Sequence, residues 1–219
     1  MITGRFLSMP PWVPVMAAMQ VAASAQPPRV LQVFREPLKP HVEAEYDRIE
    51  SDTARKCAEL RCPHAYLGVE SLTGPKEAWW FNGYDSAADQ QQVADAWANS
   101  TAALAVLGRN SKRKSRLTGK GSNSFATYRP DVSTGPPWLI GAGRFLVITV
   151  TRSAPPKGTV FETEEGTRFV IRPAGTREEA DAAAAAAGAG SRVFAVRPSW
   201  SHPADDWIAA DPQFWRRAR

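Results

Sequence analysis

Aromatic side chains are the first candidates for a binding site, and they concentrate in residues 65–84, which read AYLGVESLTGPKEAWWFNGY. Trp79, Trp80, Phe81 and Tyr84 lie close together there, and Tyr46 comes from a helix-like stretch just before. Small-molecule pockets are mostly apolar and aromatic, with a few converging polar groups. We therefore predict that these five rings bind a small aromatic or hydrophobic ligand. The alternative is that they, among eight tryptophans in the chain, only pack a core.

Three polar side chains near these rings are candidates for catalysis, namely His41, His64 and Asn82. A histidine exchanges protons near neutral pH and could take one from a phenolic substrate. An asparagine amide could donate to an oxygen that gains negative charge. The structural alternatives are an exposed helix start for His41, a loop for His64 and a strand end for Asn82. His202 is expected on the surface.

Familiar catalytic patterns are missing. The sequence has no recognisable Ser-His-Asp arrangement, phosphate loop or paired-carboxylate site. Gly141-Ala142-Gly143 precedes a predicted strand, whereas a dinucleotide fingerprint follows one. Cysteine and histidine are too sparse for a zinc site, and Cys62-Pro63-His64 is not a haem-attachment motif. We expect no metal and no cofactor, with haem as the alternative if a histidine faces a cavity.

The elements that must position these residues begin with a hairpin turning at 73–76 (TGPK). In its second strand, Trp79 and Phe81 share one face, while Trp80, Asn82 and Tyr84 share the other. A sheet with one face in water alternates apolar and polar residues. Since this strand is aromatic on both sides, we predict that both its faces are covered.

The first half, residues 29–130, follows the order strand, helix, strand, strand, helix, strand. We place the elements at 30–35, 41–60, the hairpin, a helix from Ser86 to Leu107 closed by Gly108, and 124–129. This order is ferredoxin-like. The run between Arg109 and Lys120 carries six cations and is predicted to be a solvated loop. Nucleic-acid binding is its alternative, but no nucleic-acid partner is expected.

The second half, residues 138–198, reads strand, hairpin, helix, strand, as the first half would without its first helix. Its elements are expected at 144–152, 159–172, Thr176–Gly188 and 193–196, with Thr176 and Glu179 forming a capping box. The fold class is therefore α+β, with two ferredoxin-like halves, the second degenerate, packed sheet to sheet as an intrachain α+β barrel. The aromatic and basic tail, 199–219, is expected to dock on it. The chain is then a monomer or a homodimer.

The N-terminal 25 residues resemble an export signal. Arg5 is the one charge, an uncharged and mostly apolar run follows, and Ala23-Ser24-Ala25 matches a cleavage site. A misassigned start or a disordered arm is the alternative. The prediction is a periplasmic or secreted protein without a membrane span in the mature chain. In such a compartment Cys57 and Cys62 either pair, if the helix ends near residue 60, or remain thiols.

The chain has 219 residues, a formal charge of +5 and an ordinary globular composition. Residues 29–130 resemble the dimeric α+β barrel superfamily, which includes antibiotic-biosynthesis-monooxygenase domains and NIPSNAP-like proteins. The resemblance lies in VLQVFR, HVEAEYDRIESDTARKCAEL and AYLGVESLTGPKEAWWFNGYDSAAD. It implies a pocket used for flavin-free oxygenation, haem handling or simple binding. The expected function is that of an exported, small-molecule-binding barrel, either a cofactor-independent monooxygenase of an aromatic substrate, a non-enzymatic scaffold or a haem-binding protein.

Overall fold

The computed structural model describes residues 26–135, 138 and 140–215. The predicted export signal at 1–25 and the last four residues of the tail lie outside the described residues. Within the described residues, no helix is both long and apolar enough to cross a membrane.

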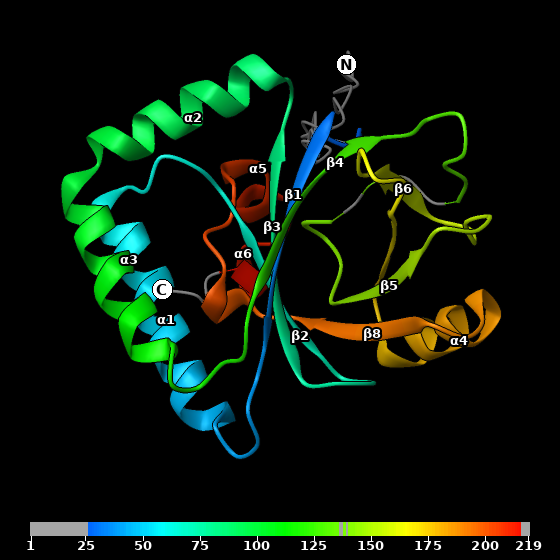
Figure 1. Cartoon of the computed structure of the whole chain (residues 1–219), viewed down its shortest axis with the longest axis horizontal. Coiled ribbons are helices and arrows are strands. Elements are labelled where there is room, and N and C mark those ends of the chain that lie inside the picture. Colours follow the sequence, from blue (N-terminus) through cyan, green and yellow to red (C-terminus); the bar gives the residue numbers. More distant parts are fainter. Residues whose placement is uncertain (1–25, 136–137, 139, 216–219) are drawn as a thin grey trace, which may run out of the picture.

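Figure 1 shows the strands and helices, which are given below in chain order. The first half comprises β1 Val30–Pro37, α1 Glu43–Leu60, β2 Leu67–Ser71, β3 Glu77–Tyr84, α2 Ala87–Asn99, α3 Thr101–Lys114 and β4 Ser122–Tyr128. The second comprises β5 Phe145–Thr151, β6 Thr159–Glu162, β7 Arg168–Ala174, α4 Arg177–Ala187 and β8 Ser191–Val196. The chain closes with η1 Pro198–Trp200, α5 Asp205–Ala210 and α6 Pro212–Trp215.

The strands form one closed antiparallel barrel in the order β1-β3-β2-β8-β5-β7-β6-β4. Each half contributes four neighbours, β4-β1-β3-β2 and β8-β5-β7-β6, so both halves repeat one ferredoxin-like strand order. The second strand of each half pairs with the fourth strand of the other, β2 with β8 and β6 with β4. The predicted fold class is thus confirmed, including closure within one chain.

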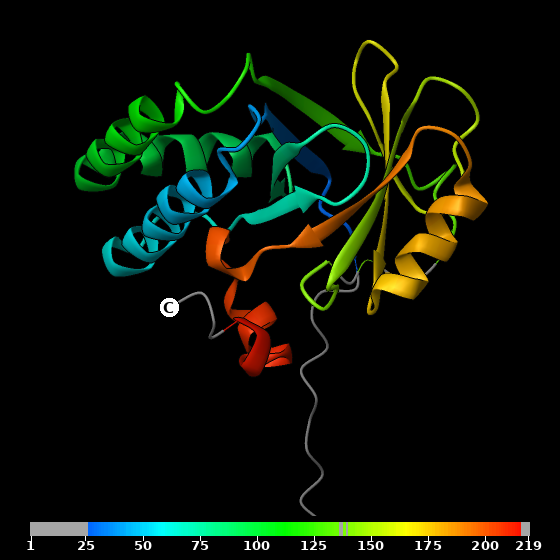
Figure 2. The same ribbon diagram turned by 90° about the horizontal axis from the view of Figure 1, so that it is seen from below.

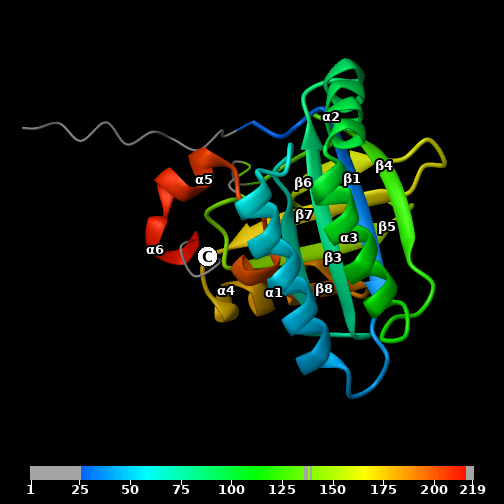
Figure 3. The same ribbon diagram turned by 90° about the vertical axis from the view of Figure 1, so that its left-hand side faces the viewer.

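The helices lie outside the barrel. Figure 2 shows α1, α2 and α3 on one flank, α4 on the opposite flank, and α5 and α6 at one end. In Figure 3, α1 and α3 cover the first sheet lengthwise. The loop 152–158 stands where the second half would have its first helix. Thr176 and Glu179 form the expected capping box at the start of α4.

The two faces of β3 are both buried, as predicted. Trp79 points into the barrel and is 1% exposed, while Trp80 points toward the helices and is 7% exposed. Inward residues of both sheets fill the barrel as one apolar core, and Trp138 and Trp215 extend that core at one end. Trp215 Nε1 donates to the Gly141 carbonyl at 2.8 Å, so the described part of the tail docks on the barrel.

One predicted helix is two. The stretch expected as a single helix from Ser86 to Leu107 breaks at Ser100, whose φ of −94° and ψ of 61° are not helical. Its N–H donates to the Trp97 carbonyl and its hydroxyl to the Ala96 carbonyl, which closes α2. Gly108 therefore lies inside α3 instead of capping a helix. The start of the basic run is helical as well, because cations are favourable at a helix C-terminus.

The cysteines are paired. Helix α1 ends at Leu60, Arg61 takes a left-handed conformation with φ 53°, and Cys62 turns back to form a disulfide with Cys57. The Cys62 N–H also donates to the Cys57 carbonyl at 2.9 Å. The early end of the helix brings the two Cα atoms to 4.8 Å, which a continuous helix could not do.

Candidate functional site

The sequence-predicted site residues separate into two places. Trp79 and Phe81 lie in the barrel core, whereas Trp80, Asn82 and Tyr84 lie on the outer face of β3. None of the main pockets in the described part of the chain is lined by all of them. Tyr46 is fully buried and packs against Trp80 from α1, at 6.3 Å between ring centroids.

His41 lies apart from the other two histidines, whereas His64 and His202 line one pocket at the end of the barrel. His41 is exposed in the turn before α1, with φ 64°. His64 lies flat against Tyr84 at the end of the barrel, with ring centroids 4.9 Å apart. His202 Nε2 lies 3.3 Å from the Cys62 carbonyl, so it is half-buried and not a free surface residue as expected.

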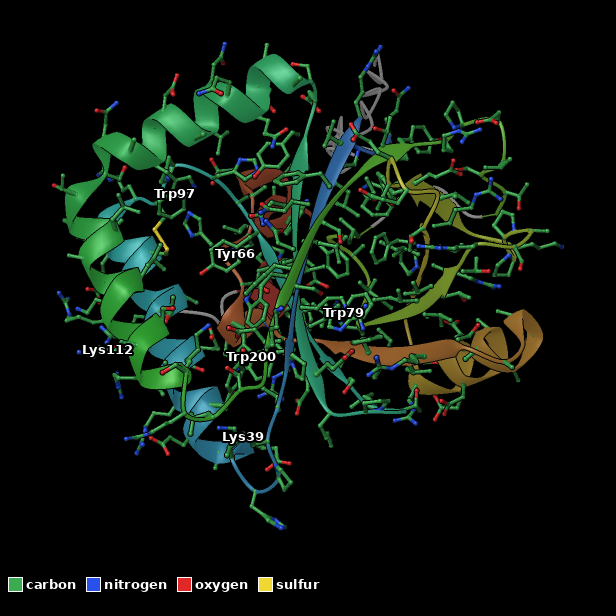
Figure 4. The ribbon with its side chains drawn as sticks, viewed as in Figure 1. Lys39, Tyr66, Trp79, Trp97, Lys112 and Trp200 are labelled. Atoms are coloured by element: carbon green, nitrogen blue, oxygen red, sulfur yellow. A yellow bond between two sulfur atoms is a disulfide. The ribbon has the colours of Figure 1, made fainter. Side chains whose placement is uncertain are left out.

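A pocket of about 280 Å³ lies between the first sheet and its helices. We call it the outer-face pocket. Its apolar walls are Phe34, Tyr66, Trp80, Trp97 and Leu107, and its polar members are Gln32, Glu50, Thr53, Asn82 and Lys114. Figure 4 shows Tyr66 and Trp97 in the space between the helices and the sheet.

A charged cluster connects three elements at this pocket. Lys114 Nζ, from α3, makes an ion pair with Glu50 of α1 and lies 3.2 Å from Glu36 Oε2 of β1. The Tyr46 hydroxyl donates to Glu36 Oε2 at 2.6 Å. Lys114 Nζ also sits 5.0 Å from the centroid of the Trp80 ring. The cluster therefore places one cation between two carboxylates, with an aromatic face beneath it.

Burial and the neighbouring charges together shift the pKa values in this cluster. Glu50 is 3% exposed, and burial raises the pKa of its carboxyl although Lys114 opposes that shift. Burial alone would lower the pKa of Lys114, but Glu50 and Glu36 raise it overall. Burial, together with Glu50 and Glu36, raises the pKa of Tyr46. Glu50 is thus a stronger base than an exposed carboxylate, next to a cation that stays charged.

A row of amides and hydroxyls fixes the other side of the pocket. Gln32 Oε1 accepts from Asn82 Nδ2 at 3.2 Å and from the Tyr84 hydroxyl at 3.1 Å. Gln32 Nε2 donates to Asn123 Oδ1 at 3.0 Å. Asn82 is therefore held in one orientation at the pocket wall.

The disulfide lies next to the outer-face pocket. Cys57, Cys62 and Ala103 make a small apolar cluster against Tyr66, Trp97 and Leu107. The last three residues also wall the outer-face pocket. The disulfide therefore packs against three residues that wall the pocket.

Sequence reasoning missed Glu50, Lys114 and Trp97 as pocket residues. Glu50 could have been found, because it lies four residues after Tyr46 on the buried side of α1, where a carboxylate needs a partner. Lys114 could not, since nothing in the basic run sets it apart from its neighbours. Among the described residues, no three carboxylate, histidine or cysteine side chains gather in a way that could hold a metal.

Neither a family model nor a curated protein matches this sequence. Several solved structures resemble the fold, and three of them are as follows. A proposed monooxygenase of Fusobacterium nucleatum subsp. nucleatum has 10% identity and a TM-score of 0.48, covering 78% of this chain and 92% of its own. A mutant chlorite dismutase of Candidatus Nitrospira defluvii in complex with cyanide has 11% identity and a TM-score of 0.44, covering 84% and 95%. An anthrone oxidase-like protein has 13% identity and a TM-score of 0.40, covering 77% and 92%. Likenesses this distant identify neither a family nor an activity.

Proposed function

We propose that the protein binds a small, flat aromatic molecule with an acidic hydroxyl or CH group in the outer-face pocket, and that Glu50 takes up its proton. The observation that carries the proposal is a buried carboxyl of raised pKa paired with Lys114, beneath aromatic walls. Apolar pockets with a few converging polar groups are the usual ligand sites, and perturbed pKa values favour a functional site.

The chemistry follows from the two charges. Glu50 accepts the proton of a phenol or an activated methylene group, and the Lys114 ammonium stabilises the anion that remains. Such an electron-rich anion can react with dioxygen directly. In a methylene substrate, the carbon loses two hydrogens and gains one oxygen atom as a carbonyl, while the second oxygen atom leaves as water. The proposed activity is therefore cofactor-independent oxygenation.

Two ligands separate binding from proton transfer. 2-Naphthol changes its absorbance when it ionises, whereas 2-methoxynaphthalene has the same rings and no acidic proton. We expect both to quench tryptophan fluorescence and only 2-naphthol to show an ionised spectrum when bound. Glu50→Gln should keep binding and lose the ionised spectrum. If 2-naphthol neither binds nor ionises, the proposal is wrong.

Oxygenation has its own test. Anthrone carries an activated methylene group, and we expect the protein to speed its oxygen uptake without added metal or flavin. Glu50→Gln should remove the acceleration. Ligand ionisation without oxygen uptake would leave a binding protein and exclude the monooxygenase.

A non-enzymatic scaffold is the second candidate, and the filled barrel favours it. Core residues such as Leu146, Phe161 and Ile171 are at most 1% exposed, so the centre of the barrel is solid core. A scaffold would tolerate Glu50→Gln with only a change in stability.

Haem does not fit the outer-face pocket. No histidine is among its described lining residues, so the pocket offers no imidazole as an axial ligand. His64 and His202 lie at the end of the barrel instead. A Soret shift that persists when His64 and His202 are both replaced by phenylalanine would place haem in the outer-face pocket and contradict this.

The proposal also covers the export of the protein and its oligomeric state. We propose cleavage after Ala25 and a periplasmic or secreted location, which the Cys57–Cys62 disulfide supports because disulfides persist in oxidising compartments. A monomer is proposed because one chain closes its own barrel. Membership of the dimeric α+β barrel superfamily is proposed from the repeated strand order. Mass spectrometry of the exported chain and light scattering test the first two.

A further inference from the structure

The two seams that close the barrel are not equally complete. At one seam β2 pairs with β8 over Val69–Ser71, and backbone hydrogen bonds extend the pairing beyond both ends of that run. At the other seam β4 pairs with β6 only through Thr127 and Tyr128. Strand β6 ends at Glu162 after four residues, whereas β4 has seven. The first part of β4, Ser122–Ala126, therefore has β1 on one side and no strand of the described chain on the other.

The backbone of this free edge has donors and acceptors that no described residue uses. The Tyr128 N–H donates to the Arg29 carbonyl just before β1, and the N–H and C=O groups of successive strand residues point alternately to its two sides. The groups of Asn123 and Phe125 therefore face away from β1, where the described chain offers them no hydrogen bond. Such an edge is a template for pairing with another extended segment.

A groove of about 500 Å³ lies along this edge. We call it the β4-edge groove. Residues 123–127 of β4 form one wall, and residues 162–165, in the turn after β6, form the other. Phe125 is 42% exposed, which is unusual for a large apolar side chain. Proteins often protect edge strands with lysine or proline, but Ser122–Ala126 contain neither. The edge is thus both accessible and unprotected.

The β4-edge groove is acidic. Three glutamates line it, and no lysine, arginine or histidine is among its described lining residues. Glu162 is neutralised by ion pairs with two arginines. Glu165 hydrogen-bonds with Thr163 and feels the charge of Arg152. The Glu164 carboxylate is exposed and makes no ion pair or hydrogen bond within the described chain. A cation on a bound segment would therefore find its partner in Glu164.

We propose that the β4-edge groove binds an extended, basic peptide segment of another protein, which adds a strand beside Ser122–Ala126. Main-chain hydrogen bonds to Asn123 and Phe125 hold the segment, and its alternate side chains give specificity. An apolar side chain lies beside Phe125, and a lysine or arginine reaches Glu164. The segment continues the course of β6 and so runs antiparallel to β4, the direction in which strand pairing is more stable.

A second copy of this chain does not fit the groove. A strand in the groove has β4 along one edge and the turn at residues 162–165 along the other. Strand β4 of a second copy already has β1 along one edge, and the other strands have neighbours on both sides in the closed barrel. Cleavage after Ala25 would not fill the groove either, because Gln26 lines a different cavity.

The test uses a capped, fluorescently labelled peptide with the sequence lysine, valine, threonine, valine, lysine, titrated with the full chain and followed by fluorescence anisotropy. The same peptide with glutamate for both lysines should bind about tenfold more weakly, because like charges meet in the groove. Two further peptides carry N-methyl groups, one on both valines and the other on the threonine and the second lysine. Each blocks one edge of the strand, so one of the two should lose about tenfold in affinity and the other should not.

Variants of the chain test the same contacts from the other side. Asn123→Pro removes an N–H that faces the groove and none that β1 uses, a place where an edge strand accepts proline. It should weaken peptide binding about tenfold. Asn123→Ala is the matched control, because it loses the same side-chain bond from Gln32 and keeps the N–H. Glu164→Gln should weaken binding several-fold, whereas Glu178→Gln, an exposed glutamate on α4, should leave it unchanged.

Several results would overturn the proposal. These are equal binding of the lysine and glutamate peptides, equal binding of the two N-methylated peptides, and a loss in Asn123→Ala as large as that in Asn123→Pro. Dimerisation of the chain in place of peptide binding would assign the edge to a second copy. The N-methylated peptides decide the question even if Asn123→Pro does not fold. Glu50→Gln should leave peptide binding unchanged, so this inference and the proposed function can fail separately.

Discussion

Lys114 Nζ from α3 lies against the Glu50 carboxylate from α1, with Lys114 13% and Glu50 3% exposed at the side chain. The contact holds two helices together over the first sheet and supplies the charges of the outer-face pocket. Removing one partner of a buried pair leaves the other charge without compensation.

We therefore expect Lys114→Met to lower the free energy of unfolding by about 3–5 kcal/mol. The double variant Lys114→Met/Glu50→Leu removes both charges and should recover much of that loss. Urea denaturation measures both. Lys112→Met, an exposed neighbour on the same helix, is the control. A cost for Lys114→Met no greater than that of the control would contradict the ion pair.

The lowered pKa of the Glu77 carboxyl predicts how the stability of the fold depends on pH. Burial would raise the pKa of its carboxyl, but hydrogen bonds from Arg192 and Trp79 and the charge of Arg35 lower it overall. A lowered pKa in the folded state stabilises the fold above the unfolded pKa of about 4.3. That stability is lost as the pH falls through the folded pKa.

The melting temperature between pH 2 and pH 7 should thus fall less steeply on the acid side in Glu77→Gln than in the unsubstituted chain. The variant should also be less stable at neutral pH, by roughly 1–3 kcal/mol for the lost charged hydrogen bonds. Glu164→Gln, at an exposed turn, should keep the full acid slope. Parallel curves for all three proteins would refute the assignment.

The disulfide should contribute to both stability and binding. Closing so short a loop stabilises by about 2 kcal/mol through the unfolded chain. We expect Cys57→Ser/Cys62→Ser to lose this amount and to bind 2-naphthol more weakly, because Tyr66, Trp97 and Leu107 pack on the cystine. A reducing agent should lower the melting temperature of the unsubstituted chain and leave the double variant unchanged. If the reductant affects both equally, the effect does not come from this bond.

Neighbouring tryptophans should separate stability from binding. Trp79→Leu cuts into the barrel core and should cost about 3 kcal/mol while 2-naphthol affinity stays within twofold. Trp80→Leu removes a wall of the outer-face pocket and should weaken 2-naphthol binding several-fold. Denaturation and titration of the same two proteins give the answer. If Trp79→Leu loses affinity for 2-naphthol and Trp80→Leu does not, the ligand binds inside the barrel.

The sequence carried enough information for the barrel. Trp79 and Trp80 on opposite faces of one strand required two cover layers, and the order of elements supplied the second sheet. The break at Ser100 could not be predicted, because no glycine or proline marks it and its hydroxyl only competes locally for a helix carbonyl.

The candidate sites were less accessible from sequence. Four of the residues predicted from sequence line a cavity. The Trp80 ring and the Asn82 amide line the outer-face pocket, and His64 and Phe81 line the cavity at the end of the barrel. The decisive partners were missed because each lies far along the chain. Trp207 reaches the cavity only through docking of α5, and the pairing of Lys114 with Glu50 depends on how α3 lies across α1.

Closure of the barrel by one chain has a consequence for stoichiometry. A symmetric pair of single-half subunits would carry two identical copies of every surface. In this chain the halves differ, because α1 and α3 cover the first sheet and α4 covers the second. A substitution in one half therefore leaves the other half unchanged. If the proposed ligand binds in the outer-face pocket, this asymmetry predicts one ligand per polypeptide.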